Sequence, residues 1–410
     1  MDTGLAAAYG EALDVLLRRA HLMAPDQLGE LALEGARVLG AADARLWLID
    51  YEQTALVALL PPHVPAPDPL GVDGSVGGRA FRGPELLDVD AGDGARRVWV
   101  PLLDGVERLG VVELVVPSEG PLPDQLRAAY EQLVHLLAEL LVSNGSYTDH
   151  YEWVRRRQPM SLAAEMQYGL LPPLTFGTER VVVSGLLAPA YEVGGDAYDY
   201  ALNGDVLHVA VFDAVGHGLQ ASLLATLAVT AYRNSRRAGL DLAHTAAEVD
   251  AALDAMFGGE RFVTALLGQL DTGTGLFRWI NAGHPAGMLL RGGQVVKELA
   301  GVPGLPLGLN SLTASGPEAF AVSTESLQPG DRLLLLTDGV DEARTEDGSF
   351  FGRTRLAEFA AREAASGLAT PEVMRRLQQA ILRHQTGKLQ DDATTLFVEW
   401  MTRDTDQLTP

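Results

Sequence analysis

The chain has 410 residues, of which 47% are hydrophobic and 21% are charged, values typical of folded soluble proteins and unlike those of disordered chains. The 54 acidic residues against 31 Lys and Arg give a net charge of −23, which disfavours binding to the phosphate backbone of nucleic acids. The absence of cysteine excludes disulfides, thiolate metal sites and thiol nucleophiles. A chain of this length is expected to form two domains.

The N-terminus has acidic residues ahead of its apolar stretch and no basic region, so it does not have the pattern of a signal peptide. No apolar run approaches the roughly 18–20 residues needed to span a bilayer. We therefore expect a cytoplasmic protein with neither a membrane nor a nucleic acid as partner.

The first segment, residues 1–118, alternates helical and strand patterns. Apolar residues at helical spacing predict helices over residues 12–19 and 27–39. Strand patterns occupy residues 45–50, 97–102 and 109–116. This order indicates an α/β module.

A glycine-rich turn at residues 71–82, GVDGSVGGRAFR, gives the chain a flexible entry into a short helix. Two helices, strands, this turn and a closing strand that reads ERLGVVELVV together resemble a GAF domain, a common sensory fold, over residues 1–118. The resemblance implies a small-ligand pocket or a dimerisation surface. Covalent bilin attachment is excluded because the chain has no cysteine.

Residues 119–171 are predicted to form a helical linker, with helices over residues 126–141 and about 150–171, the second continuing past Pro159. In the first of these helices, large apolar residues repeat in alternating steps of four and three, as in a heptad: Leu126, Tyr130, Leu133, Leu137 and Leu140. This seam is equally compatible with a homodimer contact and with a helix that packs on its own domain.

The last segment, residues 172–402, is rich in short strands. Strand-like runs lie at residues 181–187, 206–212, 262–270, 276–280, 288–290, 332–336 and 394–400, and helical runs at residues 219–237 and 242–257. Two packed sheets with helices outside would satisfy this pattern. The predicted fold class is therefore α+β, with an N-terminal α/β sensor, a helical linker and a C-terminal β-sandwich flanked by helices.

Four acidic motifs lie near strand ends in this last segment. They are VGGDAYD around Asp196, FDAVGHG around Asp213, LTDGV around Asp338 and QDDAT around Asp391. Carboxylates that converge at the margin of a sheet without partners are strongly destabilising. Divalent cations compensate such charge, and Mg²⁺ and Mn²⁺ prefer oxygen ligands. The motifs therefore predict a metal site.

These motifs resemble the PPM (PP2C-like) phosphatases of the SpoIIE/RsbU type. EMQYGLLPP, FDAVGHGLQASLLA, NAGHPAGMLL, LQPGDRLLLLTDGVDEAR and DDATTLFV occur in that family's order over residues 166–400. The resemblance implies a PP2C-like β-sandwich, two divalent metal ions (Mn²⁺ or Mg²⁺) and phosphoserine or phosphothreonine substrates. It also implies that the substrate is an anti-anti-sigma (STAS) protein in a bacterial partner-switching pathway.

Carried over motif by motif, the resemblance makes Asp196 a ligand of the first metal and Asp213 the bridge between both metals. Asp338 and Asp391 would hold the second metal, and the backbone carbonyl of Ala214 would be a further ligand. These four aspartates are the candidate catalytic residues.

Other polar residues near these motifs have less defined roles. Asp199 and Asp392 are expected to lie near the metals or on the surface without binding a cation. His217 and His284 are as compatible with stabilising turns as with catalysis.

Two functions other than a phosphatase are compatible with parts of this sequence. GGDAYD is similar to the GGDEF signature of diguanylate cyclases, but Ala197 and Tyr198 replace the acidic residue and the phenylalanine of that signature. The second alternative keeps the phosphatase fold as a catalytically weak binding module in signalling. The presence of all four motif aspartates argues against it.

Overall fold

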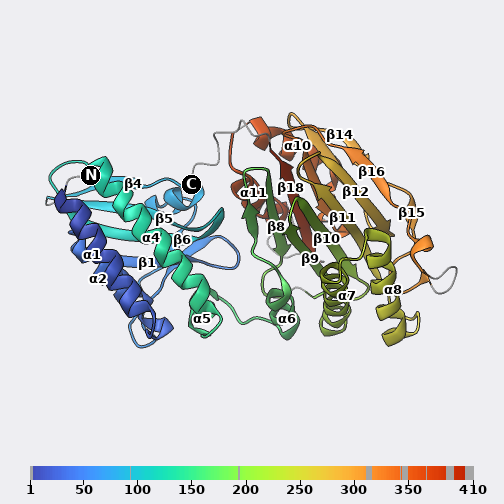
Figure 1. Ribbon diagram of the computed structural model, residues 1–410, viewed down its shortest axis with the longest axis horizontal. Helices are drawn as coiled ribbons and strands as arrows, with labels where there is room; N and C mark the ends of the chain where they lie inside the picture. Colours follow the sequence, from blue (N-terminus) through green and yellow to red (C-terminus); the bar gives the residue numbers. More distant parts are fainter. Residues whose placement is uncertain are drawn as a thin grey trace. The chain divides into compact units, whose positions relative to one another are not determined.

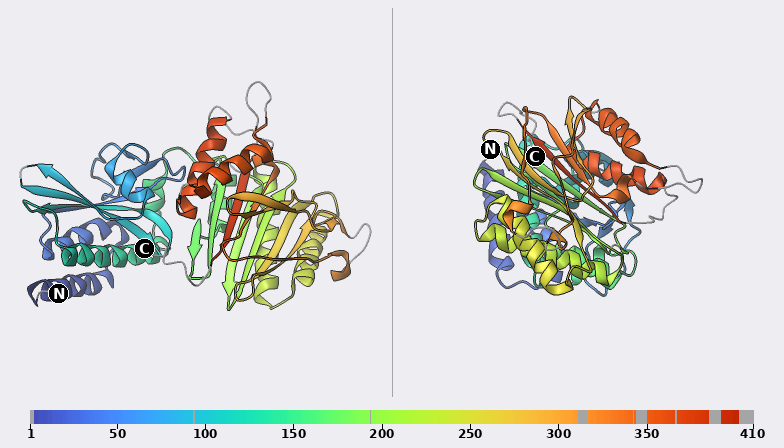
Figure 2. Two further views of the ribbon diagram at one scale, coloured as in Figure 1. Left: turned by 90° about the horizontal axis from the view of Figure 1, so that it is seen from above. Right: turned by 90° about the vertical axis from the view of Figure 1, so that its right-hand side faces the viewer.

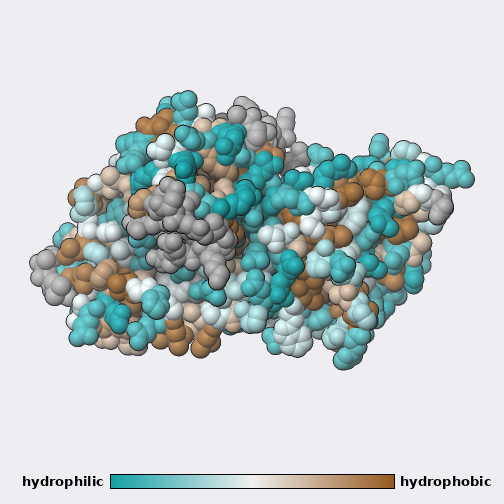
Figure 3. Space-filling model, turned by 180° about the vertical axis from the view of Figure 1, so that it is seen from behind, coloured by the Kyte–Doolittle hydropathy of each residue, from teal (hydrophilic) through white to brown (hydrophobic). Residues whose placement is uncertain are grey.

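The computed structural model describes residues 3–92, 94–192, 194–310, 316–341, 343, 350–365, 367–384 and 392–401 (Figure 1). Contacts divide the chain into an N-terminal unit and a C-terminal unit, with the boundary between Pro159 and Met160. Within the described ranges, no helix has both the length and the apolar character that a membrane span requires. Hydrophilic residues are spread over the face of the molecule shown in Figure 3.

The N-terminal unit is built on a six-stranded antiparallel sheet in the order β3-β2-β1-β6-β5-β4. Its strands are β1 (Asp43–Ile49), β2 (Ala55–Ala58), β3 (Leu70–Gly71), β4 (Leu87–Gly92), β5 (Ala95–Asp104) and β6 (Glu107–Pro117). Each of the strands predicted in this segment is present; β5 and β6 extend beyond their predicted bounds at both ends, and β1 begins two residues earlier and ends one residue earlier than predicted.

Helices cover both faces of this sheet (Figures 1 and 2). One face carries α1 (Thr3–Ala20), α2 (Leu28–Val38) and α4 (Asp124–Gly145), and the other carries α3 (Val76–Arg82); a short 3₁₀ turn, η1 (Pro25–Gln27), precedes α2. The glycine-rich turn shapes the start of α3. Ser75 caps this helix by accepting from the Gly78 amide at 2.8 Å, and a Cβ on Gly78 would come within 2.1 Å of the Val72 carbonyl oxygen. Only glycine therefore fits there.

Helix α4 belongs to the core of the N-terminal unit and is not part of a separate linker. Tyr130, Leu133 and Leu137 of the heptad seam are buried against the sheet and the neighbouring helices. The Tyr130 hydroxyl donates to the Leu39 carbonyl at 3.1 Å. Of the two interpretations of the seam, the structure therefore favours packing within the domain.

The helix predicted over residues 150–171 is interrupted. It forms α5 (His150–Arg155) in the N-terminal unit and α6 (Leu162–Leu170) in the C-terminal unit. Pro159 lies in the break, where it lacks an amide to continue a helix. The unit boundary at residue 159 thus differs from the boundaries at 118 and 171 that the sequence suggested.

Leu133→Ala is expected to lower the free energy of unfolding of the N-terminal unit by about 2–5 kcal/mol, because it leaves a cavity in a closely packed core. Val142→Ala on the same helix should change that free energy by less than about 0.5 kcal/mol, because Val142 is 46% exposed. Urea unfolding followed by hydrogen exchange in peptides of this unit measures both. A changed oligomeric state with unchanged stability of the Leu133 variant would instead identify the seam as a contact between copies.

The C-terminal unit contains two six-stranded sheets. One has the order β15-β12-β11-β10-β9 with β16 paired to β12, and the other has the order β14-β13-β17-β18-β8-β7. The strands are β7 (Thr175–Gly177), β8 (Val181–Ala188), β9 (Asp196–Asn203), β10 (Val206–Ala214), β11 (Val263–Asp271), β12 (Leu276–Ala282), β13 (Gly287–Arg291), β14 (Gln294–Leu299), β15 (Pro303–Gly304), β16 (Ser323–Ser326), β17 (Arg332–Leu336) and β18 (Ala393–Trp400).

These sheets face each other, and helices cover their outer faces (Figure 2). Helices α7 (Leu219–Arg237) and α8 (Leu242–Phe257) cover the sheet that contains β10, and α10 (Gly352–Ala365) and α11 (Thr370–His384) cover the sheet that contains β18. Two short elements, α9 (Asp338–Asp341) and η3 (Pro317–Ala319), lie in connections. The predicted sandwich flanked by helices is therefore present, with α10 and α11 in addition.

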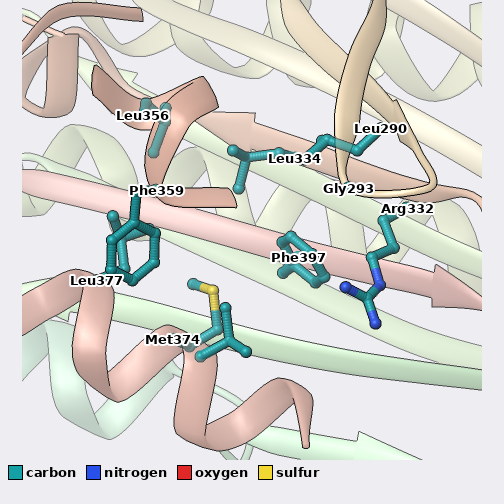
Figure 4. A pocket seen from close by; sticks show the side chains of 10 residues that line it. Leu290, Gly293, Arg332, Leu334, Leu356, Phe359, Met374, Leu377 and Phe397 are labelled. Atoms are coloured by element: carbon teal, nitrogen blue, oxygen red, sulfur yellow. The ribbon is translucent and has the colours of Figure 1, made fainter. Parts of the chain in front are cut away.

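A small apolar cavity lies under α10 and α11 (Figure 4). It measures about 10 Å³ and is lined by Leu290, Gly293, Arg332, Leu334, Leu356, Phe359, Val373, Met374, Leu377 and Phe397. A cavity of this size is too small for a ligand, and its lining has too few polar groups to bind a water molecule. Helices α10 and α11 therefore pack on the outside of the sandwich. The cavity beneath them is not a candidate functional site.

Candidate metal centre

Two of the motif aspartates meet across neighbouring strands. Asp196 begins β9 and Asp213 lies one residue before the end of β10, and the antiparallel register places them directly opposite each other. Residues in such a pair have Cβ atoms about 4.5–5.5 Å apart on the same face of the sheet. Like charges in this arrangement repel each other. The pairing therefore brings two of the predicted ligands together and leaves their charge to be compensated.

Asp196 is the buried member of the pair, with 3% of its surface exposed. Burial, the neighbouring Asp213 and then Asp392 raise the pKa of Asp196 well above the usual range of a carboxyl group. The Thr337 hydroxyl, at the end of β17, donates to Asp196 Oδ2 at 2.6 Å. The Thr337 hydroxyl fixes the carboxylate in place, while burial and the neighbouring carboxylates disfavour its ionised form.

Asp392 is part of this cluster. Its Oδ2 accepts from the Gly194 amide at 2.8 Å and from the Asp196 amide at 3.5 Å. The side chain is half-buried and holds Gly194 and Asp196 against the start of β18. Asp392 thus lies beside Asp196.

The motif that contains Asp338 reaches the same place through its glycine. Asp338 is the exposed first residue of α9, which follows β17. A Cβ on Gly339 would lie 1.8 Å from the Asp392 carbonyl oxygen, so only glycine permits this approach. The Thr394 amide also donates to the Thr337 hydroxyl at 3.0 Å. These contacts join the third motif to the fourth.

The fourth predicted ligand, Asp391, lies outside the described residues. The Ala214 carbonyl oxygen is 3.2 Å from the position of a Cβ on Gly195, so it faces the VGGD loop. Among the described residues, no three His, Asp or Glu side chains meet the geometry of a metal site. The donors that do converge are carboxylate, hydroxyl and carbonyl oxygens around a buried acid, and this chemistry fits Mg²⁺ or Mn²⁺.

Asp199 has a separate role that the sequence did not indicate. It is 1% exposed and lies three residues after Asp196 in β9. Arg233 Nη2 and Arg236 Nη1 on α7 pair with its two oxygens at 2.7 and 2.8 Å. Arg233 Nη2 also donates to the Leu170 carbonyl at 2.5 Å, which connects the end of α6 to β9. Arg233 and Arg236 lie more than 30 residues after Asp199 in the sequence, so the sequence does not indicate that they pair with it.

The two histidines differ in their surroundings. His217 is exposed in the loop after Asp213. His284 is buried, its Nδ1 lies 2.8 Å from the Thr264 hydroxyl, and its amide donates to Asn281 Oδ1 at 2.8 Å. Burial lowers the pKa of His284 to about 4, so the ring is neutral at pH 7. His284 therefore stabilises the turn after β12, and it carries no charge to the site.

Comparison with known proteins identifies the C-terminal unit. Residues 203–401 match the family model described as Stage II sporulation protein E (SpoIIE). Phosphoserine phosphatase RsbU from Bacillus subtilis is 22% identical over 267 residues, which cover 64% of this chain and 77% of RsbU. The C-terminal unit is a SpoIIE-type domain of the PP2C-like serine/threonine phosphatases. Asp213, Asp338 and Asp391 fall inside the matched SpoIIE range, and Asp196 lies just before it.

Further relatives share parts of this chain. Protein IcfG from Synechocystis is 24% identical over 270 residues, covering 59% of this chain and 41% of IcfG. The structure of the SiaA-PP2C domain of Pseudomonas aeruginosa is 26% identical with a TM-score of 0.48, covering 58% of this chain and 94% of that one. The RsbU and RsbW domains of Rv1364c from Mycobacterium tuberculosis are 28% identical with a TM-score of 0.46, covering 57% and 63%. The chain thus spans less than two thirds of IcfG and of the Rv1364c structure.

Asp196→Asn is expected to stabilise the C-terminal unit in the absence of metal at pH 7, raising its unfolding temperature by about 2–6 °C, because it removes a buried charge that faces two carboxylates. A carboxyl whose pKa is raised by folding loses stability as the pH rises from its unfolded pKa through its folded pKa. The variant should therefore lack that loss.

Thermal unfolding of the full chain between about pH 5 and pH 8, with and without Mn²⁺, measures this effect. Mn²⁺ should stabilise the wild type and leave the variant unchanged. A variant that unfolds at lower temperature at every pH would show that the protein alone stabilises the ionised Asp196.

Proposed function

We propose that the C-terminal unit hydrolyses phosphoserine or phosphothreonine in a protein substrate, using two divalent cations, Mn²⁺ or Mg²⁺. The observation that carries this proposal is the buried Asp196 directly opposite Asp213, with Asp392 and the Asp338 turn beside them. Asp196, Asp213, Asp338, Asp391 and the Ala214 carbonyl would hold the cations. When bound, such a pair of cations activates water for in-line attack and neutralises charge on the phosphoryl oxygens.

The residues of the chain have defined tasks in this reaction. The Thr337 hydroxyl orients Asp196, and Asp392 fixes the loop that leads into it. Gly216 and Gly218 have φ of +99° and +69°, and the resulting sharp turn directs the chain away from Asp213 into α7. A Cβ on Gly194 would lie 2.7 Å from the Gly218 amide nitrogen, so the two loops touch through their backbones.

The substrate we propose is a phosphorylated anti-anti-sigma (STAS) protein of a bacterial partner-switching pathway. The resemblance to the SpoIIE/RsbU type supports this choice, and the relative RsbU is named a phosphoserine phosphatase. A net charge of −23 gives no reason to expect a nucleic acid in its place.

The alternative is a binding module with the same fold and little catalysis. Such a module could still bind metal, because metal binding depends only on the carboxylates. Turnover of a phosphoprotein separates the two functions, and metal binding alone does not.

Asp213→Asn is expected to abolish Mn²⁺-dependent release of phosphate from a phosphorylated STAS protein, with a loss of at least about 100-fold, because both cations depend on this carboxylate. Asp205→Asn provides a matched control, because Asp205 lies at the other end of the β9–β10 hairpin and its side chain is 72% exposed. The control should keep the wild-type rate. Undiminished turnover of the Asp213 variant, or turnover in excess chelator, would contradict the mechanism.

We further propose that the N-terminal unit is a GAF-like sensory domain with a small-ligand pocket. A cavity of about 400 Å³ supports this. It is lined by Leu70, Ser75, Val76, Gly77, Val89, Asp90, Ala91, Arg97 and Trp99. The Trp99 indole N–H is buried and has no hydrogen-bond partner among the described residues. A buried donor of this kind would be satisfied by an acceptor on a ligand.

Control of the phosphatase by the N-terminal unit would act through α6, the first helix after the unit boundary. Arg233 holds the Leu170 carbonyl of α6 and Asp199 of β9 at once, so a shift of α6 would be felt in the strand that begins with Asp196. Coupling requires a second arrangement of this helix. Gln167 of α6 is fully buried, and its amide has no partner among the described residues. An unsatisfied amide raises the energy of this arrangement and so favours a second one.

A chain that starts at Met160 is expected to fold and bind Mn²⁺ but to turn over substrate at a rate different from that of the full chain, because the N-terminal unit no longer acts on α6. Arg233→Lys should bring the two rates closer together, because lysine cannot hold Leu170 and Asp199 at once as the guanidinium fork does.

Steady-state rates of the four proteins with one phosphoprotein substrate measure this coupling. An unchanged ratio between the full and the shortened chain in the Arg233 variant would place the coupling elsewhere. A shortened chain that binds Mn²⁺ normally without any turnover would show that the N-terminal unit contributes to catalysis.

A further inference from the structure

One arginine lies at the rim of the carboxylate cluster. The antiparallel pairing of β10 with β11 places Ala214 opposite Val263, and the Val215 amide continues this pairing by donating to the Phe262 carbonyl at 3.2 Å. Arg261 therefore comes opposite Gly216. Its Nη1 lies 3.7 Å from the position that a Cβ on Gly216 would occupy. The guanidinium thus rests against the loop that leaves Asp213.

The loop that the Arg261 guanidinium contacts begins just after Asp213. Gly216 follows Asp213 by three residues, so their Cα atoms are at most about 11 Å apart. The loop also turns sharply at Gly216, where φ is +99°, which shortens the path. Because the Arg261 guanidinium rests against this short loop, we infer that the side chain can turn toward a phosphoryl group bound at Asp213.

Arg261 is positively charged, and no described residue forms an ion pair with it. Its Nη2 donates to Gln220 Oε1 at 3.1 Å, a neutral acceptor in the first turn of α7, and this bond is exposed. In the described part of the chain it makes no ion pair. Arg233 and Arg236, by contrast, are both paired with the buried Asp199. The charge of Arg261 therefore remains available to an anion from outside.

A phosphoprotein brings a dianion to a site built from carboxylates. Cations offset part of the repulsion, and a guanidinium at the rim adds a fixed positive charge with two donors spaced for phosphoryl oxygens. Gln220 holds the guanidinium in position through one neutral bond, which a charged acceptor would displace. Gly216 has no side chain to block access to Nη1.

We propose that Arg261 binds the phosphoryl group of the substrate and orients it over the carboxylate cluster. This inference rests on the proposed phosphatase function and adds to it a residue that the motifs do not indicate. The competing explanation is structural, in which Arg261 only ties the loop before β11 to α7 through Gln220.

The test uses the full chain with Mn²⁺ and a phosphoserine peptide. Arg261→Gln is expected to raise KM about tenfold and to change kcat less than about threefold, because the interaction with the phosphoryl group is already made in the bound substrate. The inhibition constant of inorganic phosphate should rise in parallel. Arg261→Lys keeps the charge without the fork, so its values should fall between those of the wild type and Arg261→Gln. Arg237→Gln, at the exposed far end of α7, is the control and should match the wild type.

Gln220→Met separates binding from structure, because it breaks the Arg261–Gln220 bond and keeps the charge. Binding of phosphate by Arg261 predicts a KM equal to or below that of the wild type, and a structural tie predicts the same defect as Arg261→Gln. Unchanged KM and phosphate inhibition in Arg261→Gln would overturn the inference, as would equal defects in both variants.

Calorimetric binding of inorganic phosphate to the Mn²⁺-loaded chain keeps the two proposals distinguishable. Absence of turnover in the wild type would reject the phosphatase function. Weaker phosphate binding by Arg261→Gln than by the wild type would still support the role of Arg261, and equal binding would reject it. Mn²⁺ affinity should be the same in the wild type and all these variants.

Discussion

The C-terminal unit depends on a repulsion that its fold imposes. The register of β9 and β10 places Asp196 opposite Asp213, and the sandwich excludes water from the first of these carboxylates. A cross-strand pair of like charges destabilises a sheet, and burial increases the effect. A cation turns the same pair into a binding site. Under the proposed function, the SpoIIE-type domain would be less stable without metal because it holds these carboxylates in place for it.

Close contact between backbones is what allows four separate motifs to share this site. Gly194 lies against Gly218, and Gly339 lies against the Asp392 carbonyl, at distances that leave no room for a Cβ. In the sequence, a glycine next to an aspartate indicates no more than a turn. The tighter constraint on these glycines is the contact between loops, which a sequence pattern cannot show because the partners are distant along the chain.

A sequence pattern shows local properties but not contacts between distant residues, and this explains which predictions succeeded and which did not. Period-two patterns and the order of motifs were enough to predict the sandwich, because both are local properties of the chain. The heptad seam of α4 was ambiguous, since Tyr130, Leu133 and Leu137 would show the same spacing whether they face a second copy or their own sheet. The helix expected across Pro159 was wrong, because the missing amide of Pro159 interrupts a helix even where the apolar pattern continues. Asp199 could not be assigned, because its arginines come from another element.

The placement of arginines follows the same electrostatic logic as the placement of aspartates. Asp199 lies in the same strand as Asp196, yet two guanidiniums of α7 neutralise it, so it adds little to the repulsion at the site. Asp196 is buried directly opposite Asp213, and under the proposed function cations would compensate the charge of this pair. One acidic residue of β9 thus anchors a helix, and another would bind metal under the proposed function. Asp199 faces Arg233 and Arg236 of α7, whereas Arg261 makes no ion pair within the described residues and rests against the loop that leaves Asp213, where a phosphoryl group would arrive.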